Sequence, residues 1–76
     1  MNDVRRKELR RALKMLEEAQ EIIEWARDDE QEAFDNLPEG LQVSERGERM
    51  EENVDNLDNA ASGFEDIIDY INEVLE

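Results

Sequence analysis

Apolar residues recur along the second half of the chain in alternating steps of four and three residues. This uninterrupted heptad spacing predicts one amphipathic helix with a continuous apolar stripe, which we call the seam. A further apolar row beside it makes the stripe wider than a two-stranded coiled coil requires. On this helix the seam contains Met50, Val54, Leu57, Ala61, Phe64, Ile68, Ile71 and Leu75.

A second heptad pattern occupies the first half, with large residues in one row and alanine in the other. Small residues on a seam let two backbones approach to the short end of the ~8–10 Å range of packed helices, so this row predicts an alanine-lined contact. The alternative is that alanine is present because it is the best helix former. On this helix the seam contains Leu9, Ala12, Leu16, Ala19, Ile23, Ala26 and Ala33.

Glu30 interrupts the row of large residues in the first half as its one polar member. Paired with Arg49 or Arg46, a polar group on the seam would specify the register of the two helices. The alternative is a solvated position near the end of a helix.

The segment NLPEGLQVS, residues 36–44, separates the two patterns. Pro38 disfavours helical geometry at the preceding residue, and Gly40 can adopt a positive φ. Ser44 is suited to cap the helix that follows, and Asp3 to cap the first. We therefore expect one domain, 1–76, with a helix over about 3–36, a loop over 37–43 and a helix over about 44–75.

So short a connection makes the two helices antiparallel neighbours, with residue i opposite about residue 81 − i. A two-helix hairpin buries few side chains, and chains of this size usually need a disulfide, a metal or oligomerisation. The predicted fold is therefore all-α: an antiparallel two-helix coiled-coil hairpin with an alanine seam, which dimerises into a four-helix bundle.

One side of the predicted hairpin, which we call the apolar edge, carries apolar residues of both helices, whereas the opposite edge is polar. A patch of several hundred Å² is large enough to mark an interaction surface. We expect a homodimer, with docking onto a different protein as the alternative. The mid-helix Gly63 costs ~1 kcal/mol, which close approach of another backbone would explain. A tolerated flaw or a local hinge is the alternative. The apolar edge consists of Met15, Ile22, Trp25, Ala60, Gly63, Ile67, Tyr70 and Val74.

Charge is distributed as unevenly as hydrophobicity. Residues 1–14 hold six basic and two acidic side chains, a net of +4, whereas residues 15–76 hold three basic and 21 acidic, a net of −18. The six basic residues lie in residues 5–14, the basic segment, which the hairpin places beside residues 67–76. Several exposed ion pairs of ~0.2–1 kcal/mol each should therefore fix the antiparallel orientation. A nucleic-acid-binding arm is the alternative, but the neighbouring acids would compete for its cations.

A chain this acidic should avoid nucleic acids and anionic membranes, because both are polyanions. Over an expected length of roughly 45 Å, the acidic part carries one net charge per ~2.5 Å, against ~1.7 Å in duplex DNA. Such a rod can occupy the nucleic-acid groove of a host protein with a basic surface and so act as an inhibitor by DNA mimicry. The alternative is that the acids only keep the protein soluble.

The composition argues against catalysis and bound cofactors. Without Cys or His, disulfides and the usual zinc sites are impossible, and Ser44 and Ser62 lack the base that a nucleophile needs. The segment DNLDNAASGFED resembles a calcium loop, but Leu57 and Ala60 stand where an oxygen ligand and a glycine are required. We expect no catalytic, cofactor or metal residues. Because no signal peptide or membrane span is evident, we expect a cytoplasmic protein.

The segment EQEAFDNLPEGLQVSERGERMEE, residues 30–52, together with the acidic and apolar repeat after it, is similar to short helical-hairpin proteins encoded by bacteriophages and bacterial mobile elements. The resemblance implies a bacterial or phage cytoplasmic setting and favours a host-directed inhibitor, but it assigns no residue a role. The sequence thus predicts a non-enzymatic, homodimeric, acidic protein–protein interaction module. The alternative is a purely structural coiled-coil protein without a nucleic-acid-site target.

Overall fold

The two long helices begin close to the predicted residues, and a side chain caps each of them. The side chain of Asn2 accepts a hydrogen bond from the backbone N–H of Arg5 (2.9 Å), so Asn2 caps the first helix and the expected cap, Asp3, is its first residue. Ser44 caps the last helix as predicted, because its Oγ accepts a hydrogen bond from the N–H of Gly47 (3.4 Å). The computed structural model describes residues 1–76 and contains α1 (Asp3–Asp35), α2 (Glu39–Gln42) and α3 (Glu45–Leu75).

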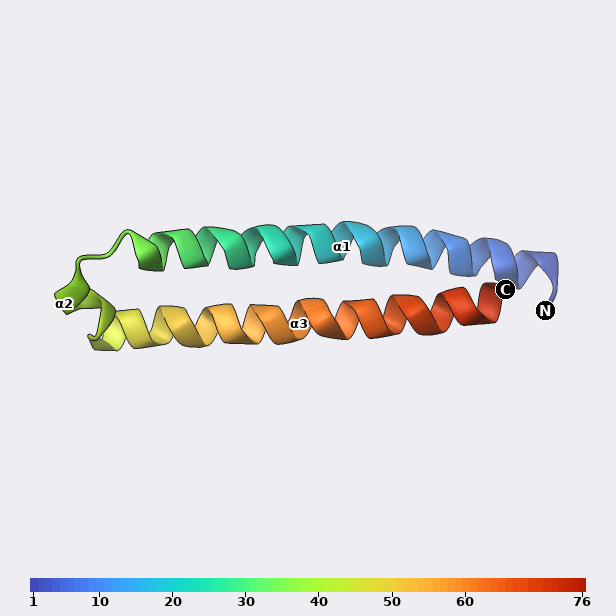
Figure 1. The fold of residues 1–76 in the computed structure, drawn as a ribbon. Coiled ribbons are helices and arrows are strands. Elements are labelled where there is room, and N and C mark those ends of the chain that lie inside the picture. Colours follow the sequence, from blue (N-terminus) through green and yellow to red (C-terminus); the bar gives the residue numbers. More distant parts are fainter.

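The two long helices, α1 and α3, lie side by side and antiparallel, with both chain ends at one end of the rod and α2 at the other (Figure 1). We call these the open end and the tip. The rod measures 58 × 15 × 14 Å. It is longer than the roughly 45 Å expected, because 33 helical residues in α1 alone rise about 50 Å. The residue numbers of three cross-helix contacts sum to 81, 83 and 85: Arg6 with Leu75, Glu30 with Asn53, and Arg27 with Asp58.

The tip is a short helix instead of the predicted loop. The carbonyl oxygen of Pro38 accepts hydrogen bonds from the N–H groups of Leu41 (2.8 Å) and Gln42 (3.1 Å), which closes one helical turn. Gly40 therefore lies inside α2 and does not adopt the positive φ that is open to a glycine. The side chain of Gln42 donates to the carbonyl oxygen of Phe34 (3.2 Å) and so ties the tip to the end of α1.

Gly47 is required where the tip meets α3. It is buried, and a Cβ built on it would lie 2.1 Å from the carbonyl oxygen of Gln42 and 2.6 Å from that of Leu41. Both atoms belong to the backbone, which cannot rotate away as a side chain could. The chain can therefore return into α3 this tightly only at a residue without a side chain.

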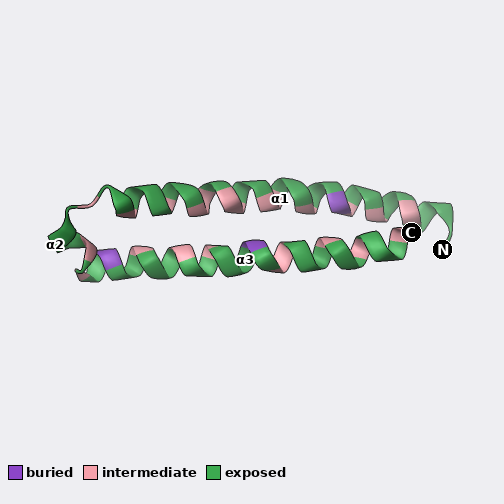
Figure 2. Cartoon of the chain, in the orientation of Figure 1, coloured by how far each residue is buried: buried purple, intermediate pink, exposed green.

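The contact between α1 and α3 is thin. Leu13 and Ala61 are the only buried apolar residues, and the other inward-facing residues are half-buried (Figure 2). On α3 every predicted seam residue is buried or half-buried. On α1 the half-buried seam residues are Leu9, Ala12, Leu16, Ala19, Ile23 and Ala26.

Ala33 is exposed, which corrects its assignment to the seam. The row next to the predicted seam turns inward instead, and its apolar members Leu13 and Phe34 are buried and half-buried, respectively. Burying a phenyl ring removes more apolar surface from water than burying a methyl group, so α1 is rotated to favour Phe34 over Ala33. The same rotation carries the row of Met15 and Ile22 further from α3.

Candidate interaction surface

The large side chains of the apolar edge are exposed in the hairpin. Trp25 is 66% exposed and Tyr70 is 71% exposed, although an aromatic side chain has the most apolar area to bury. Ala60 is also exposed, and Gly63 is half-buried. The remaining members are exposed as well: Met15, Ile22, Ile67 and Val74.

The register brings the two halves of the apolar edge together. Because opposing residue numbers sum to about 83, Met15 lies near the level of Ile67, and Ile22 lies near the level of Ala60. In an antiparallel pair, equivalent heptad rows of the two helices meet along the same edge. The residues therefore form one surface that runs from the open end of the rod to just past its middle.

Gly63 leaves a gap in this surface. A Cβ built on it would meet no atom within 4 Å, and its φ is not positive. Neither packing nor backbone geometry within the hairpin therefore requires a glycine at this position, in contrast to Gly47. The space above Gly63 lies between Ala60 and Ile67 along the same face of α3, open to a side chain from outside.

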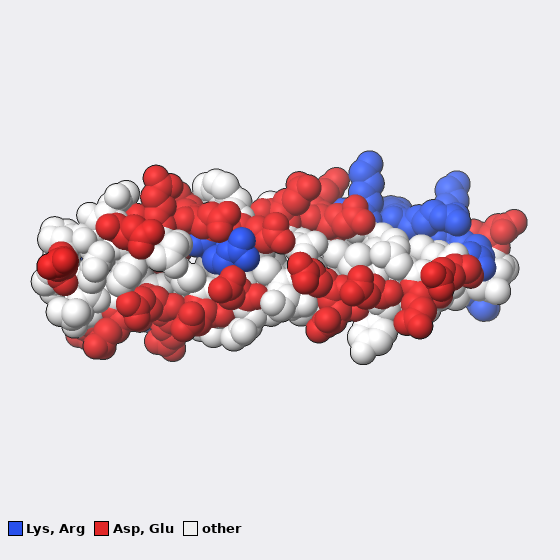
Figure 3. Space-filling view, in the orientation of Figure 1, with Lys and Arg blue, Asp and Glu red and all other residues white.

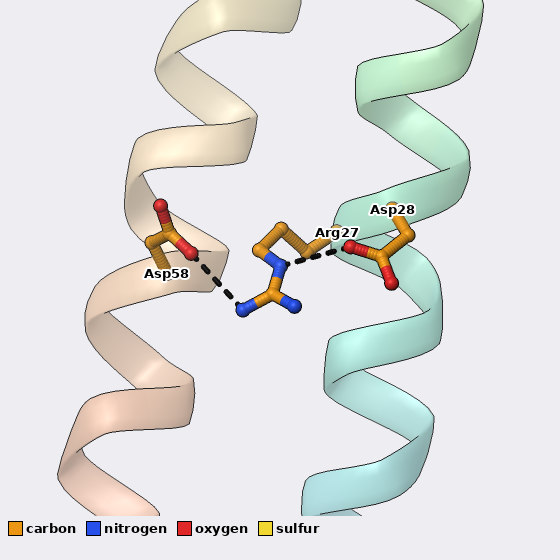
Figure 4. Close-up of polar contacts among 3 residues, drawn as sticks. All are labelled: Arg27, Asp28 and Asp58. Atoms are coloured by element: carbon orange, nitrogen blue, oxygen red, sulfur yellow. Dashed lines mark hydrogen bonds and ion pairs between the residues drawn. The ribbon is translucent and has the colours of Figure 1, made fainter.

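The opposite edge carries a charged bridge between the helices. Arg27 donates from Nε to Oδ1 of Asp28 and from Nη1 to Oδ1 of Asp58, both at 3.1 Å (Figure 4). The hydrogen bond with Asp28 is the main cause that raises the pKa of Arg27, and Asp58 raises it further, while burial lowers it. The heptad pattern did not predict this bridge, although Arg27 is the only basic residue between Lys14 and Arg46.

The basic segment does not make the ion pairs expected with α3. Apart from the two salt bridges of Arg27, the structure contains one between Arg11 and Glu8 within α1 (3.4 Å). The acids Asp69 and Glu73 are exposed and occupy heptad positions on the outer face of α3, away from α1.

Arg6 is the exception in the basic segment, because it reaches across to α3. Its Nη1 donates to the carbonyl oxygen of Leu75 at 2.7 Å. The last carbonyls of a helix lack partners within the helix, and the negative end of the helix dipole attracts a cation. Arg6 thus stabilises the C-terminus of α3, whose last turn has no basic residue of its own.

Most of the negative charge is not neutralised within the hairpin. Three of the 23 acidic residues form salt bridges, namely Glu8, Asp28 and Asp58. Figure 3 shows acidic side chains along both helices and a group of basic side chains near the N-terminus. The net −18 of residues 15–76 is spread over 58 Å, one charge per about 3.2 Å, which is a lower density than expected.

Glu30 has a different partner from the predicted arginines. It accepts a hydrogen bond from Nδ2 of Asn53 at 2.8 Å and forms no salt bridge with Arg46 or Arg49. A shallow depression nearby on α3 has no apolar lining residue. It is formed by Glu45, Glu48, Arg49, Glu52 and Asn53.

The two serines occupy different environments. The hydroxyl of Ser44 donates to the carbonyl oxygen of Leu41 while it caps α3, and Ser62 is exposed. No cluster of three or more acidic side chains has the geometry to hold a metal ion. None of the helices combines the length and apolarity that crossing a bilayer requires.

No protein-family model matches the chain, and no curated protein or solved structure is significantly similar to it. The indications of its function therefore lie in its own surface. The apolar edge is the part of that surface whose exposure to water is least favourable.

Proposed function

We propose that the chain is a non-enzymatic interaction module whose apolar edge binds a second copy. Two hairpins, each closed along its alanine-lined seam, then form a four-helix bundle. The proposal is carried by the exposure of Ile22, Trp25 and Tyr70 on one edge, next to a core with only two buried apolar residues. Exposed aromatic and aliphatic side chains gathered in this way are typical of an interface.

The total exposed area supports the same proposal. The hairpin exposes 5910 Å². A compact monomer of 9.0 kDa would expose about 4,900 Å². The excess of about 1,000 Å² is comparable to the ~800 Å² that each partner buries in a stable complex. A second copy seated on the apolar edge would therefore bring the burial of this small chain to an ordinary level.

Replacing Trp25 with alanine tests this function. We expect the dimer dissociation constant of Trp25→Ala to rise at least about tenfold, because truncating an anchoring aromatic side chain costs about 2 kcal/mol or more. Sedimentation equilibrium measures the change. Val43→Ala is the matched control, because Val43 is 77% exposed but lies at the tip, outside the apolar edge. A wild-type chain that stays monomeric at high micromolar concentration would reject the proposal.

As a second candidate, we propose that the acidic faces occupy the basic nucleic-acid-binding surface of another protein. The observation in its favour is the long array of acids without cationic partners in the hairpin. One net charge per about 3.2 Å is less dense than the ~1.7 Å of duplex DNA, so a single hairpin is an incomplete mimic. Pairing of two hairpins would double the charge where they overlap. In this second proposal the chain acts in the cytoplasm of a bacterium, where a bacterial or phage genome encodes it.

A further inference from the structure

We propose that the two copies pair antiparallel to one another, centred on Met15 and Ile67. The acidic tip of each hairpin then projects past the open end of the other. This arrangement rests on the proposed function, because it takes the apolar edge as the contact between copies. It adds the orientation, the register and the residues that meet.

The α3 part of the apolar edge is complementary to itself when reversed. Ala60 and Val74 lie seven residues on either side of Ile67, and Gly63 and Tyr70 lie four and three residues from it. Two antiparallel copies of α3 that cross at Ile67 therefore place Tyr70 over Gly63, and Val74 over Ala60. In each case a large side chain meets a small one. Tyr70 is 71% exposed, and a Cβ built on Gly63 would meet no atom within 4 Å.

The α1 part of the apolar edge also pairs with its own reversed copy, about a centre at the level of Ile67. Opposing residue numbers in the hairpin sum to about 83, so Met15 lies level with Ile67 and faces Met15 of the second copy. Residues of α1 whose numbers sum to about 30 then oppose each other. Arg11 meets Glu18 of the second copy, and Trp25 meets the exposed Val4 at its open end.

A two-fold axis explains why like helices oppose each other. When two rods stack face to face with reversed directions, the symmetry axis runs across the rods, so α1 covers α1 and α3 covers α3. A two-fold axis along the rods would instead give a parallel pair, in which α1 covers α3.

Charge favours the antiparallel pair. The basic segment holds six basic residues and one acidic residue, a net of +5, and five of the six reach no group on α3. In the antiparallel pair it lies against residues 16–25 of the second copy. That stretch has four acidic residues and no basic one, a net of −4. Opposite charges along the rim of an interface fix orientation and register more than affinity.

A parallel pair would bring the two acidic tips together. Residues 26–56 hold 11 acidic and three basic side chains, a net of −8 in each copy. The basic segment would still find the acids at the end of α3 in a parallel pair. The antiparallel pair sets the two α3 helices against each other, but the six acids of residues 58–76 occupy heptad positions b, e and f, away from the apolar edge. The repulsion between the tips is therefore the larger difference. The antiparallel pair separates the tips to opposite ends, further apart than the ~10 Å over which exposed charges interact in 0.1 M salt.

The overlap of the two rods is sufficient for a stable interface. With the centre at Met15, residues 3–27 of α1 overlap, which is about 37 Å of helix. Two helices of about 10 Å diameter give a footprint of about 700 Å² on each copy, close to the ~800 Å² of a standard interface.

Spin labels on single cysteines test the arrangement in the full chain, which has no native cysteine. Lys14 and Glu32 are both exposed and form no salt bridge. In the antiparallel dimer, labels on Lys14→Cys lie within about 20 Å of each other, because this position is next to the symmetry axis. Labels on Glu32→Cys are separated by 34 residue steps of ~1.5 Å, about 50 Å. Electron–electron dipolar spectroscopy measures both distances.

The two proposals fail in different ways. A distance below about 30 Å for Glu32→Cys, in a chain that sediments as a dimer, means that the tips lie together and overturns the antiparallel arrangement but not the dimer. The absence of dipolar coupling at Lys14→Cys in a chain that sediments as a monomer overturns the proposed function itself. A distance of about 50 Å at Glu32→Cys with a short distance at Lys14→Cys supports both.

Discussion

At the scale of single residues, the two glycines of the tip region differ in what the structure demands of them. A Cβ on Gly47 would collide with the backbone of α2, whereas a Cβ on Gly40 would meet nothing within 4 Å. We therefore expect Gly47→Ala to lower the free energy of unfolding by about 1–3 kcal/mol, as over-packed sites do. Thermal and urea unfolding followed by circular dichroism would measure the change.

Gly40→Ala is the matched control for this prediction. Gly40 lies inside α2 with a φ that alanine can adopt, so alanine should raise the free energy of unfolding by about 0.4–1 kcal/mol by restricting the unfolded chain. Equal effects of the two substitutions would show that the close approach at Gly47 does not constrain the tip in solution.

At the scale of the helices, Arg27 is the one cation that bridges α1 and α3 through side chains. Arg27→Gln leaves Asp28 and Asp58 on the same edge without a counter-charge. We expect the melting temperature to fall by about 3 °C at neutral pH, an effect in the range of exposed ion pairs in a small domain. Arg49→Gln removes the same charge from a residue without a salt bridge and serves as the control.

The pH dependence of this effect follows from the direction of the pKa shift. The partners raise the pKa of Arg27 in the folded hairpin. A raised pKa means that the stabilisation is complete below the ordinary arginine pKa and is lost only as the pH rises through the folded value. The difference in melting temperature between wild type and Arg27→Gln should therefore be the same at about pH 7 and about pH 10. A difference that shrinks in this interval would show that arginine ionisation is not its cause.

The residues that form each long helix could be predicted from local chemistry, but the rotation of α1 about its axis could not. The Ser44 cap and the heptad row of α3 are properties of neighbouring residues, and they appeared in the structure as predicted. The inward turn of Phe34 in place of Ala33 depends on what faces them across the hairpin. The α2 helix was missed because Pro38 ends α1 and, by accepting two hydrogen bonds at its carbonyl, also begins another helix.

At the scale of the whole molecule, salt separates the two candidate functions. Binding of a basic surface through acidic faces should weaken at least about tenfold between about 0.05 and 0.3 M salt, because exposed charges are screened. Self-association through the apolar edge should change much less. The test compares proteins captured from a bacterial lysate by the immobilised wild-type chain at the two salt concentrations, with elution by duplex DNA. Capture that neither salt nor DNA reverses would contradict nucleic-acid mimicry.

The sequence by itself determined the two amphipathic helices, the break between them, the uneven charge and the apolar edge. These features depend on residue type and on spacing along one helix, and both can be read from a linear chain. Only the tertiary structure decided that Gly47 must be a glycine, that Arg6 and Arg27 cross to α3 while their basic neighbours do not, and how far α1 turns. The physical reason is that each of these depends on atoms distant in sequence, whose separation is set by the packing of one helix on the other.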